Sequence, residues 1–150
     1  MKIECRHSYQ NSRDNVWLYL QDVHILEKTL PGCKKLTAVG DGLYDAELGL
    51  DIGPIKGSFS GEVRLLDRQA PESYRLLLHG SGKPGEVDAD AVIRLVENGI
   101  DTEVVCESEA HVTGMMASVG QRVMGSVARM LLGRFFKGVE TELNKATLSS

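Results

Sequence analysis

Six strand-like runs follow one another in the middle of this chain with no helical period among them. They cover residues 33–39, 43–52, 55–67, 73–82, 86–97 and 100–113. In the run at 55–67, apolar residues or glycines alternate with polar residues, a pattern typical of a sheet with one wet face. Residues 2–9 alternate in the same way. We therefore predict a seven-stranded antiparallel sheet.

Two short helices are predicted between the first strand and the second. Ser12 suits the N-cap of one helix, and Asp22 suits the N-cap of the next. The second helix should end at Pro31-Gly32, because proline and glycine stop helices.

Residues 114–150 are predicted to form one long helix whose apolar stripe is built mainly from valine and methionine. At about 100° per residue, Gly120 lies at the centre of this stripe. The stripe itself contains Met116, Val119, Val123, Met124, Val127, Met130 and Leu131. An interior glycine costs a helix roughly 1 kcal/mol relative to alanine. Its presence suggests either close backbone approach to the sheet or space for a ligand beside flexible methionines.

Beyond Gly133 the apolar stripe of this helix turns, which predicts a bend. Phe135 and Phe136 then either pack against the two short helices, or close a pocket mouth or contact another surface.

The order of elements favours a single α+β domain over residues 1–150, in which the curved sheet surrounds the long helix. Several small residues would face this interior, among them Ala89, Ala91, Ala110, Gly57 and Gly61. An empty apolar void of about 300 Å³ would cost about 7 kcal/mol, against a total stability of about 5–15 kcal/mol. The space should therefore be filled by long side chains or occupied by an apolar guest.

The pocket lining is predicted from the inward parity of the strands and of the helix. It consists of Trp17, Tyr44, Leu48, Phe59, Val63, Leu76, Leu78, Ala91, Ile93, Val104, Cys106, Met116, Val119, Gly120, Val123, Met124, Val127 and Met130.

The last two strands are predicted to form a hairpin around Asn98-Gly99, a strong turn signal. Pairing Glu97 with Ile100 sets the register, which places Ala91 opposite Cys106.

This register gathers an acidic patch on the outer face of the hairpin, formed by Asp88, Asp90, Glu107 and Glu109. In this register Asp88 lies opposite Glu109, and Asp90 lies opposite Glu107. Like charges directly opposite destabilise a sheet by up to about 1 kcal/mol. The patch is either a docking surface for a basic partner or a cation, or a solvated face relieved by His79 or a nearby lysine.

Composition excludes several function classes. The formal net charge is −4 over 150 residues, with no basic stripe, which argues against a nucleic-acid-binding protein. Neither the three cysteines nor the four histidines show metal-ligand spacing, so no metal is expected. The glycine-rich segment 80–85 joins two strands and is a turn, not a phosphate loop. Without a signal peptide or an apolar run of about 18 residues, we expect a cytoplasmic protein.

Five segments spread over nearly the whole chain combine into a recognisable pattern. They are Trp17-Leu18-Tyr19-Leu20-Gln21-Asp22, Leu30-Pro31-Gly32-Cys33, Gly53-Pro54-Ile55-Lys56-Gly57-Ser58-Phe59-Ser60-Gly61, the helix start at 114–122 and the pair Phe135-Phe136. In these segments the sequence resembles the carbon monoxide dehydrogenase CoxG family of the START-like (SRPBCC) superfamily. The resemblance implies the helix-grip fold, also called Bet v 1-like, with a deep hydrophobic pocket.

For function, the resemblance implies a non-catalytic accessory protein without a cofactor. Such a protein would bind a lipid or quinone and assist a molybdenum hydroxylase or its recruitment to the inner face of the cell membrane. Many family members carry an apolar C-terminal tail after the last helix, so this sequence resembles a short or shortened member.

An enzyme of the polyketide cyclase type, which uses the same fold, is the alternative. It would need convergent acid, base or tyrosine side chains inside the pocket. The inward parity offers only His7, Tyr9, Tyr44, Tyr74, Thr102 and Ser108.

Overall fold

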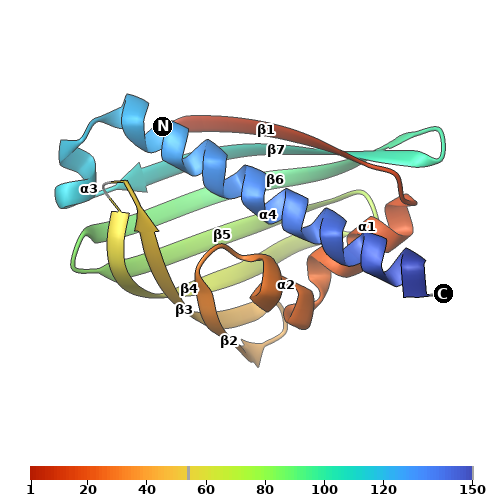
Figure 1. The fold of residues 1–150 in the computed structure, drawn as a ribbon, viewed down its shortest axis with the longest axis horizontal. Coiled ribbons are helices and arrows are strands. Elements are labelled where there is room, and N and C mark those ends of the chain that lie inside the picture. Colours follow the sequence, from red (N-terminus) through yellow and green to blue (C-terminus); the bar gives the residue numbers. More distant parts are fainter. Residues whose placement is uncertain (54, 150) are drawn as a thin grey trace.

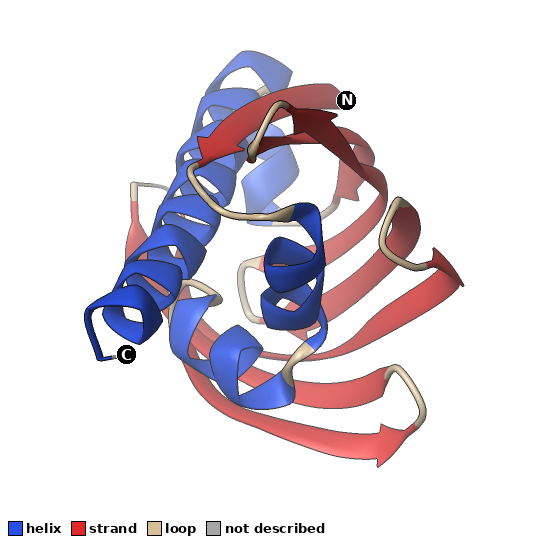
Figure 2. Ribbon diagram, turned by 90° about the vertical axis from the view of Figure 1, so that its right-hand side faces the viewer, coloured by secondary structure: helices blue, strands red, loops and turns tan. Residues whose placement is uncertain are grey.

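The computed structural model contains a curved antiparallel sheet that wraps around a long C-terminal helix (Figures 1 and 2). The structure describes residues 1–53 and 55–149. Pro54 of the 53–61 segment and Ser150 of the predicted helix lie outside the described residues. Seven strands in the described part of the chain pair in the order β1-β7-β6-β5-β4-β3-β2. The predicted sheet and its enclosed helix are confirmed.

The elements fall close to the ranges that periodicity predicted. In chain order they are β1 (Lys2–Tyr9), α1 (Arg13–Gln21), α2 (Val23–Thr29), β2 (Cys33–Gly40), β3 (Leu43–Ile52), β4 (Ile55–Gln69), β5 (Ser73–Gly82), β6 (Gly85–Asn98), β7 (Asp101–Val112), α3 (Met115–Ser118) and α4 (Gln121–Ser149).

The two short helices begin at the predicted caps. The Ser12 hydroxyl accepts a hydrogen bond from the Asn15 amide at 3.3 Å, and the Asp22 carboxylate accepts from the amides of His24 and Ile25 at 2.8 and 3.2 Å. These bonds satisfy amides that a helix start leaves free. Figure 2 shows α1 and α2 together closing one end of the curved sheet beside α4.

The β6–β7 register differs from the prediction. The turn lies one residue later, so Asn98 pairs with Asp101, and Gly99 takes a positive φ of 67°. Ala91 consequently faces Ser108 instead of Cys106. Because side chains alternate with a period of two, this two-residue shift keeps every side chain on its predicted face. The error changes cross-strand partners and leaves the inner surface intact.

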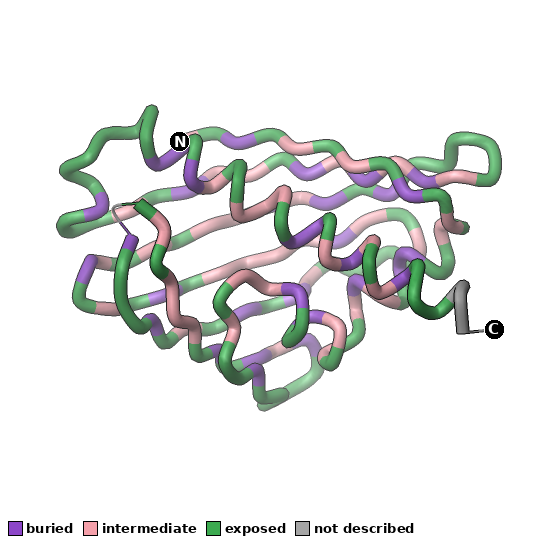
Figure 3. Tube along the Cα trace, viewed as in Figure 1, coloured by how far each residue is buried: buried purple, intermediate pink, exposed green. Residues whose placement is uncertain are grey.

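The predicted single helix at the C-terminus is wrong at its start. A short helix, α3, ends at Ser118, and α4 begins at Gln121 (Figure 1). The residues between the two helices are exposed, in the green stretch of the tube before α4 (Figure 3). Gly120 between them has φ +92°, and Gly114 before α3 has φ +70°, conformations that strain residues with a β-carbon. These two glycines therefore serve the backbone path. At Gly133, where a bend was predicted, α4 continues without interruption of its helical residues.

The predicted apolar stripe is only partly buried. The prediction continued one helical period through residue 120, where the helix is interrupted. Within α4 it also included Val123 and Met130, which lie beside the buried face of the helix and not on it. Val119, Val123 and Met130 are exposed to 36, 45 and 39%. Met116 and Met124 are buried.

The C-terminal half of α4 packs tightly against β1, α1 and α2. Phe135 and Phe136 are 7 and 1% exposed, within one buried cluster that includes Val16, Leu20 and Tyr9. The Tyr9 hydroxyl donates to the Phe136 carbonyl at 2.8 Å. The phenylalanine pair therefore packs against the short helices, and both residues also border the cavity described below.

Replacing two of the glycines by alanine should have opposite effects on stability. Gly120→Ala should lower the free energy of unfolding by about 1–2 kcal/mol, because alanine disfavours a left-handed backbone. Gly133→Ala should raise it by up to about 1 kcal/mol, because an alanine favours a helix interior. Neither added methyl group meets a heavy atom within 4 Å, so packing does not confound the pair. Urea unfolding followed by circular dichroism measures both, and a shift of both in one direction would contradict the assigned break.

Candidate functional site

A cavity of about 260 Å³ lies between the sheet and α4. Its walls are almost entirely apolar and come from strands β1 and β3–β7, from α1 and α2, and from α3 and α4. Small residues create part of the space: Ala46, Ala89, Ala91, Ala110 and Ala128 all line it. Wherever an alanine occupies an inward position, the side chain stops short of the helix and leaves volume unfilled.

Gly61, which also lines the cavity, has a different reason to be glycine. A β-carbon there would lie 1.9 Å from the backbone carbonyl oxygen of His79 on the neighbouring strand. Close approach of two strands therefore requires this glycine. Alanine side chains therefore shape the cavity wall, and Gly61 contributes by allowing β4 and β5 to approach closely.

Most predicted pocket residues do line the cavity. They are Leu48, Phe59, Val63, Leu76, Leu78, Ala91, Ile93, Cys106, Met116, Met124 and Val127. Strand parity placed the sheet residues among them on the inward face, and the helical period placed Met116, Met124 and Val127. Their contact with a ligand stays a prediction.

The other predicted pocket residues lie elsewhere. Trp17, Tyr44 and Val104 are buried in the core cluster that contains α1 and α2, outside the cavity lining. Val119, Gly120, Val123 and Met130 are exposed. Tyr44 and Val104 are inward on their strands, but parity does not specify position along the sheet, and Trp17 lies on α1. Val119 and Gly120 lie in the break between α3 and α4, whereas Val123 and Met130 lie on an exposed edge of α4.

Sequence reasoning also missed cavity residues on the two short helices and near the β3–β4 turn. Leu20, Leu26 and Leu30 come from α1 and from α2 with its C-cap, and Leu50 and Ile55 flank the β3–β4 turn. The apolar positions of the short helices were a visible signal. Their direction toward the cavity depends on how the helices dock.

The cavity is expensive if it stays empty. Extrapolating roughly 24 cal/mol per Å³, 260 Å³ corresponds to a destabilisation of the order of 6 kcal/mol. A whole domain is stable by about 5–15 kcal/mol. This magnitude favours an occupant over a vacant space.

Polar groups near the interior are engaged in structural hydrogen bonds. The Tyr9 hydroxyl is bound to the Phe136 carbonyl, and the Thr102 hydroxyl donates to the Asn11 carbonyl at 2.8 Å. Burial, and secondarily the Glu140 charge, raises the pKa of Tyr9. Neither Tyr9 nor Thr102 lines the cavity.

Tyr74, Ser108 and Cys106 are the polar or titratable residues that face the cavity from the inner sides of β5–β7. Tyr74 packs edge-on against Trp17, with ring centroids 5.4 Å apart, and burial raises its pKa. Burial also raises the pKa of the Cys106 thiol to about 12. The phenol and the thiol are therefore neutral near pH 7 and behave as part of the apolar wall.

His7 lies outside the cavity lining and joins the sheet to the helix. Its Nε2 lies 2.5 Å from the Glu140 carboxylate of α4. This hydrogen bond between His7 and Glu140 links β1 to the C-terminal half of α4, next to the bond of the Tyr9 hydroxyl.

Two carboxylates of the acidic patch, Asp88 and Asp90, pair with bases of the neighbouring strand β5. Arg75 Nε donates to Asp90 Oδ1 at 2.8 Å, and a second guanidinium bond to the same carboxylate holds its pKa below the usual range. His79 Nδ1 lies 2.7 Å from Asp88 Oδ1, which raises the His79 pKa. The solvated-face interpretation therefore describes this patch, with an arginine and His79 supplying the relief.

The observed register removes both predicted acid pairs of the hairpin and creates one new acid pair. Asp88 pairs with His111 across β6 and β7, and Asp90 pairs with Glu109. Glu107 faces Val92, so repulsion between directly opposed acids on these two strands is confined to Asp90 and Glu109.

A surface groove of about 380 Å³ adjoins the cavity. Leu30, Pro31 and Leu50 line both spaces. Lys28 of α2 and Arg134 of α4 line the groove and bring positive charge to it. The sequence did not signal this groove, because its charged residues come from separate elements.

Metal ligation and membrane spanning find no support in the described part of the chain. No group of three or more histidine, cysteine or acidic side chains there is arranged to hold a metal ion. No α-helix within the same residues combines the length and the hydropathy of a membrane-spanning segment.

Comparison with solved structures supports the fold. A conserved protein from Geobacillus kaustophilus is 34% identical, with a TM-score of 0.94 and 97% of each chain covered. A START superfamily protein from Mycobacterium smegmatis has a TM-score of 0.79 at 10% identity, covering 97% of this chain and 98% of that one. A Thermus thermophilus protein has a TM-score of 0.73 at 13% identity, covering 97 and 99%. The two distant structures show the START-like fold alone.

Sequence comparison identifies the family. No curated protein matches the chain. A match to the family described as the CoxG subunit of carbon monoxide dehydrogenase extends over residues 7–144. It covers every strand from the middle of β1 onward and most of α4. With this match and the START-like helix-grip architecture, the chain belongs to the carbon monoxide dehydrogenase CoxG family.

Proposed function

We propose that this protein carries an apolar small molecule, a lipid or a quinone, in the cavity between the sheet and α4. The observation that carries the proposal is the cavity itself: about 260 Å³ with apolar walls, in a family with a START-like fold. An apolar guest would gain roughly 25 cal/mol for each Å² of surface removed from water. It would also relieve the cost of the empty space.

We further propose that the protein serves as a non-catalytic accessory to a molybdenum hydroxylase and assists its recruitment to the membrane. The family supports this role, since its members are described as a subunit of carbon monoxide dehydrogenase. The proposed partnership can be tested by co-expressing the protein with a molybdenum hydroxylase from the same organism and asking whether the two co-elute. Separate elution at micromolar concentration, with the guest bound, would count against the partner.

The lining supports a carrier more than a polyketide cyclase. Of the inward polar residues that an enzyme would use, only Tyr74 and Ser108 line the cavity. Tyr9 and Thr102 are committed to backbone carbonyls, and His7 to Glu140. A carrier needs a wall without reactive groups, and this wall has that composition.

Filling the cavity should displace the guest. In Ala110→Leu the larger side chain occupies part of the volume, so solvent extraction of the purified protein followed by mass spectrometry should recover much less guest than from the wild type. The free energy of unfolding of the empty protein should rise by about 1–2 kcal/mol, as expected for added buried methylene groups. Ala38→Leu, on the exposed surface of β2, is the matched control and should change neither quantity.

Absorbance of the same extracts separates a quinone from a lipid. Extracts without any apolar compound, from a wild-type protein purified without detergent, would contradict the carrier proposal. Equal recovery from Ala110→Leu and the wild type would place the guest outside this cavity.

The Cys106 thiol should behave as an inert part of the wall. Its pKa of about 12 leaves almost no thiolate at pH 8, and its side chain is buried. Iodoacetamide should therefore modify Cys106 only after unfolding in urea, whereas the half-buried Cys33 reacts earlier. Peptide mass spectrometry over time measures both. Modification of native Cys106 as fast as Cys33 would show a reactive cavity thiol and favour the enzyme.

A further inference from the structure

We propose that the guest is a single-chain amphiphile with an anionic head group, whose chain fills the cavity and whose head lies in the adjoining groove beside Lys28, Lys34 and Arg134. This inference rests on the proposed carrier function and, of the two guests proposed there, selects a lipid over a quinone, whose ring is uncharged. A carboxylate and a phosphate head share this chemistry.

The first argument is continuity between the two spaces. Leu30, Pro31 and Leu50 belong to the walls of both the cavity and the groove. They lie at the end of α2 and on the facing part of β3. A chain that enters the cavity past these residues leaves its other end in the groove.

The second argument is the charge of the groove. Lys28 and Arg134 line it, and the Lys34 ammonium extends over Gly49, another lining residue, within 3.1 Å of where a β-carbon would stand. The one acidic residue of the lining, Asp51, lies 3.7 Å from the Lys56 ammonium. The chain as a whole has a net charge of −4, so the positive charge of the groove is a local feature. This local positive charge attracts an anion.

Arg134 is the cation available for a head group. Among the described residues no carboxylate lies within 4.0 Å of its guanidinium, whereas Lys28 Nζ lies 4.0 Å from Glu142 Oε2. The planar guanidinium also suits both carboxylate and phosphate, which it can bind through two hydrogen bonds.

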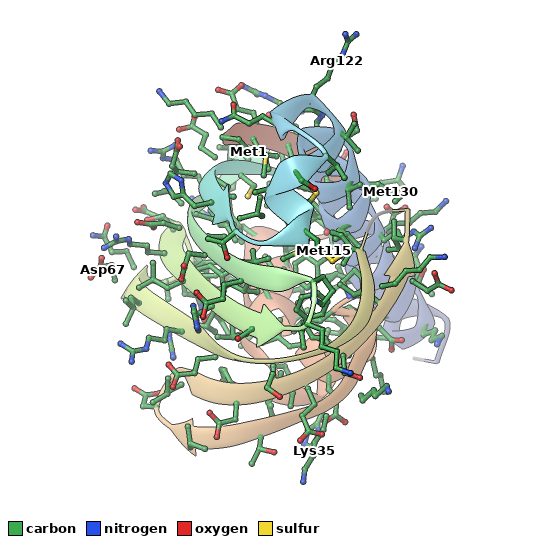
Figure 4. All side chains as sticks on the ribbon, turned by 90° about the vertical axis from the view of Figure 1, so that its left-hand side faces the viewer. Met1, Lys35, Asp67, Met115, Arg122 and Met130 are labelled. Carbon is green, nitrogen blue, oxygen red and sulfur yellow. The ribbon has the colours of Figure 1, made fainter. Side chains whose placement is uncertain are left out.

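The edge of α4 that carries Arg134 is amphipathic. Met130 and Val123 precede it by four and eleven residues, so the three share one edge of the helix. The two apolar side chains are exposed to 39 and 45%, and Figure 4 shows Met130 at the molecular surface. Both apolar side chains lie outside the cavity lining, so the edge bears on the proposal only through the cation at its end.

The third argument is size. At about 260 Å³, the cavity lies near the lower end of the range for small-molecule sites, about 300–1,000 Å³. Such a volume suits one alkyl or isoprenoid chain better than the two chains of a diacyl lipid. Burying a charged head in the apolar cavity would cost several kcal/mol, so the head belongs in the groove.

The test compares dodecanoate, dodecyl phosphate and dodecanol, each titrated into delipidated protein below its micelle-forming concentration and followed by calorimetry. The two anions should bind at least tenfold more tightly than the alcohol. Added salt should weaken the binding of the two anions and leave the binding of the alcohol unchanged. Whichever anion binds more tightly identifies the head group as carboxylate or phosphate.

Charge reversal locates the head. Arg134→Glu should weaken both anions at least tenfold and leave dodecanol unchanged, with Arg134→Gln intermediate. Arg122→Glu is the matched control, because Arg122 lies on the same helix, outside the groove, and points away from the molecule (Figure 4). It should change none of the affinities. Circular dichroism checks that each variant is folded.

The outcomes separate this inference from the carrier function. Equal affinity for the three compounds, or an Arg134→Glu variant that binds the anions like the wild type, would overturn the anionic head while leaving the carrier function in place. Failure of all three compounds to bind, together with no guest in the extracts, would overturn both.

Discussion

The packing of α4 across the concave face of the sheet is the constraint on which the rest of the structure depends. Toward its C-terminus the helix is held closely, by Phe136 and Val139 in the core and by the His7–Glu140 and Tyr9–Phe136 hydrogen bonds to β1. Toward its N-terminus a separate buried cluster around Met124 contacts Phe59 of β4. The cavity lies under the helix that these two regions hold, and it persists because α4 is anchored on either side of it.

The chemistry of the enclosed space follows from the same arrangement. Inward polar groups lie mostly at the tightly packed end, where backbone carbonyls or a carboxylate engage them. The cavity receives alanine, leucine and methionine side chains instead. Burial keeps its thiol and its phenol neutral. Such a wall can hold an apolar molecule without reacting with it, which is the property that a carrier requires.

Charged residues are paired on the outer face of the sheet, whereas positive charge is in excess beside the cavity. On the outer face of the sheet, acids and bases neutralise one another across the strands, as Arg75 does for Asp90 and His79 for Asp88. Beside the cavity, by contrast, the cations of the groove outnumber its single lining carboxylate, Asp51. Exposed ion pairs contribute little to stability. The groove therefore differs from the rest of the surface in what it can recognise more than in how it stabilises the fold.

Local sequence was sufficient for the order of the elements, for the caps at Ser12 and Asp22 and for the inner face of the sheet. These features depend on neighbours within a few residues, and the inner face survived even the misplaced turn at Gly99, because a shift of two preserves the alternation of side chains. Tertiary structure alone decided the break at Gly120, the position of Trp17 and Tyr44 away from the cavity, and the meeting of Lys28, Lys34 and Arg134 at one groove. Each of these depends on the curvature of the sheet and the path of α4 across it, which no stretch of local sequence specifies.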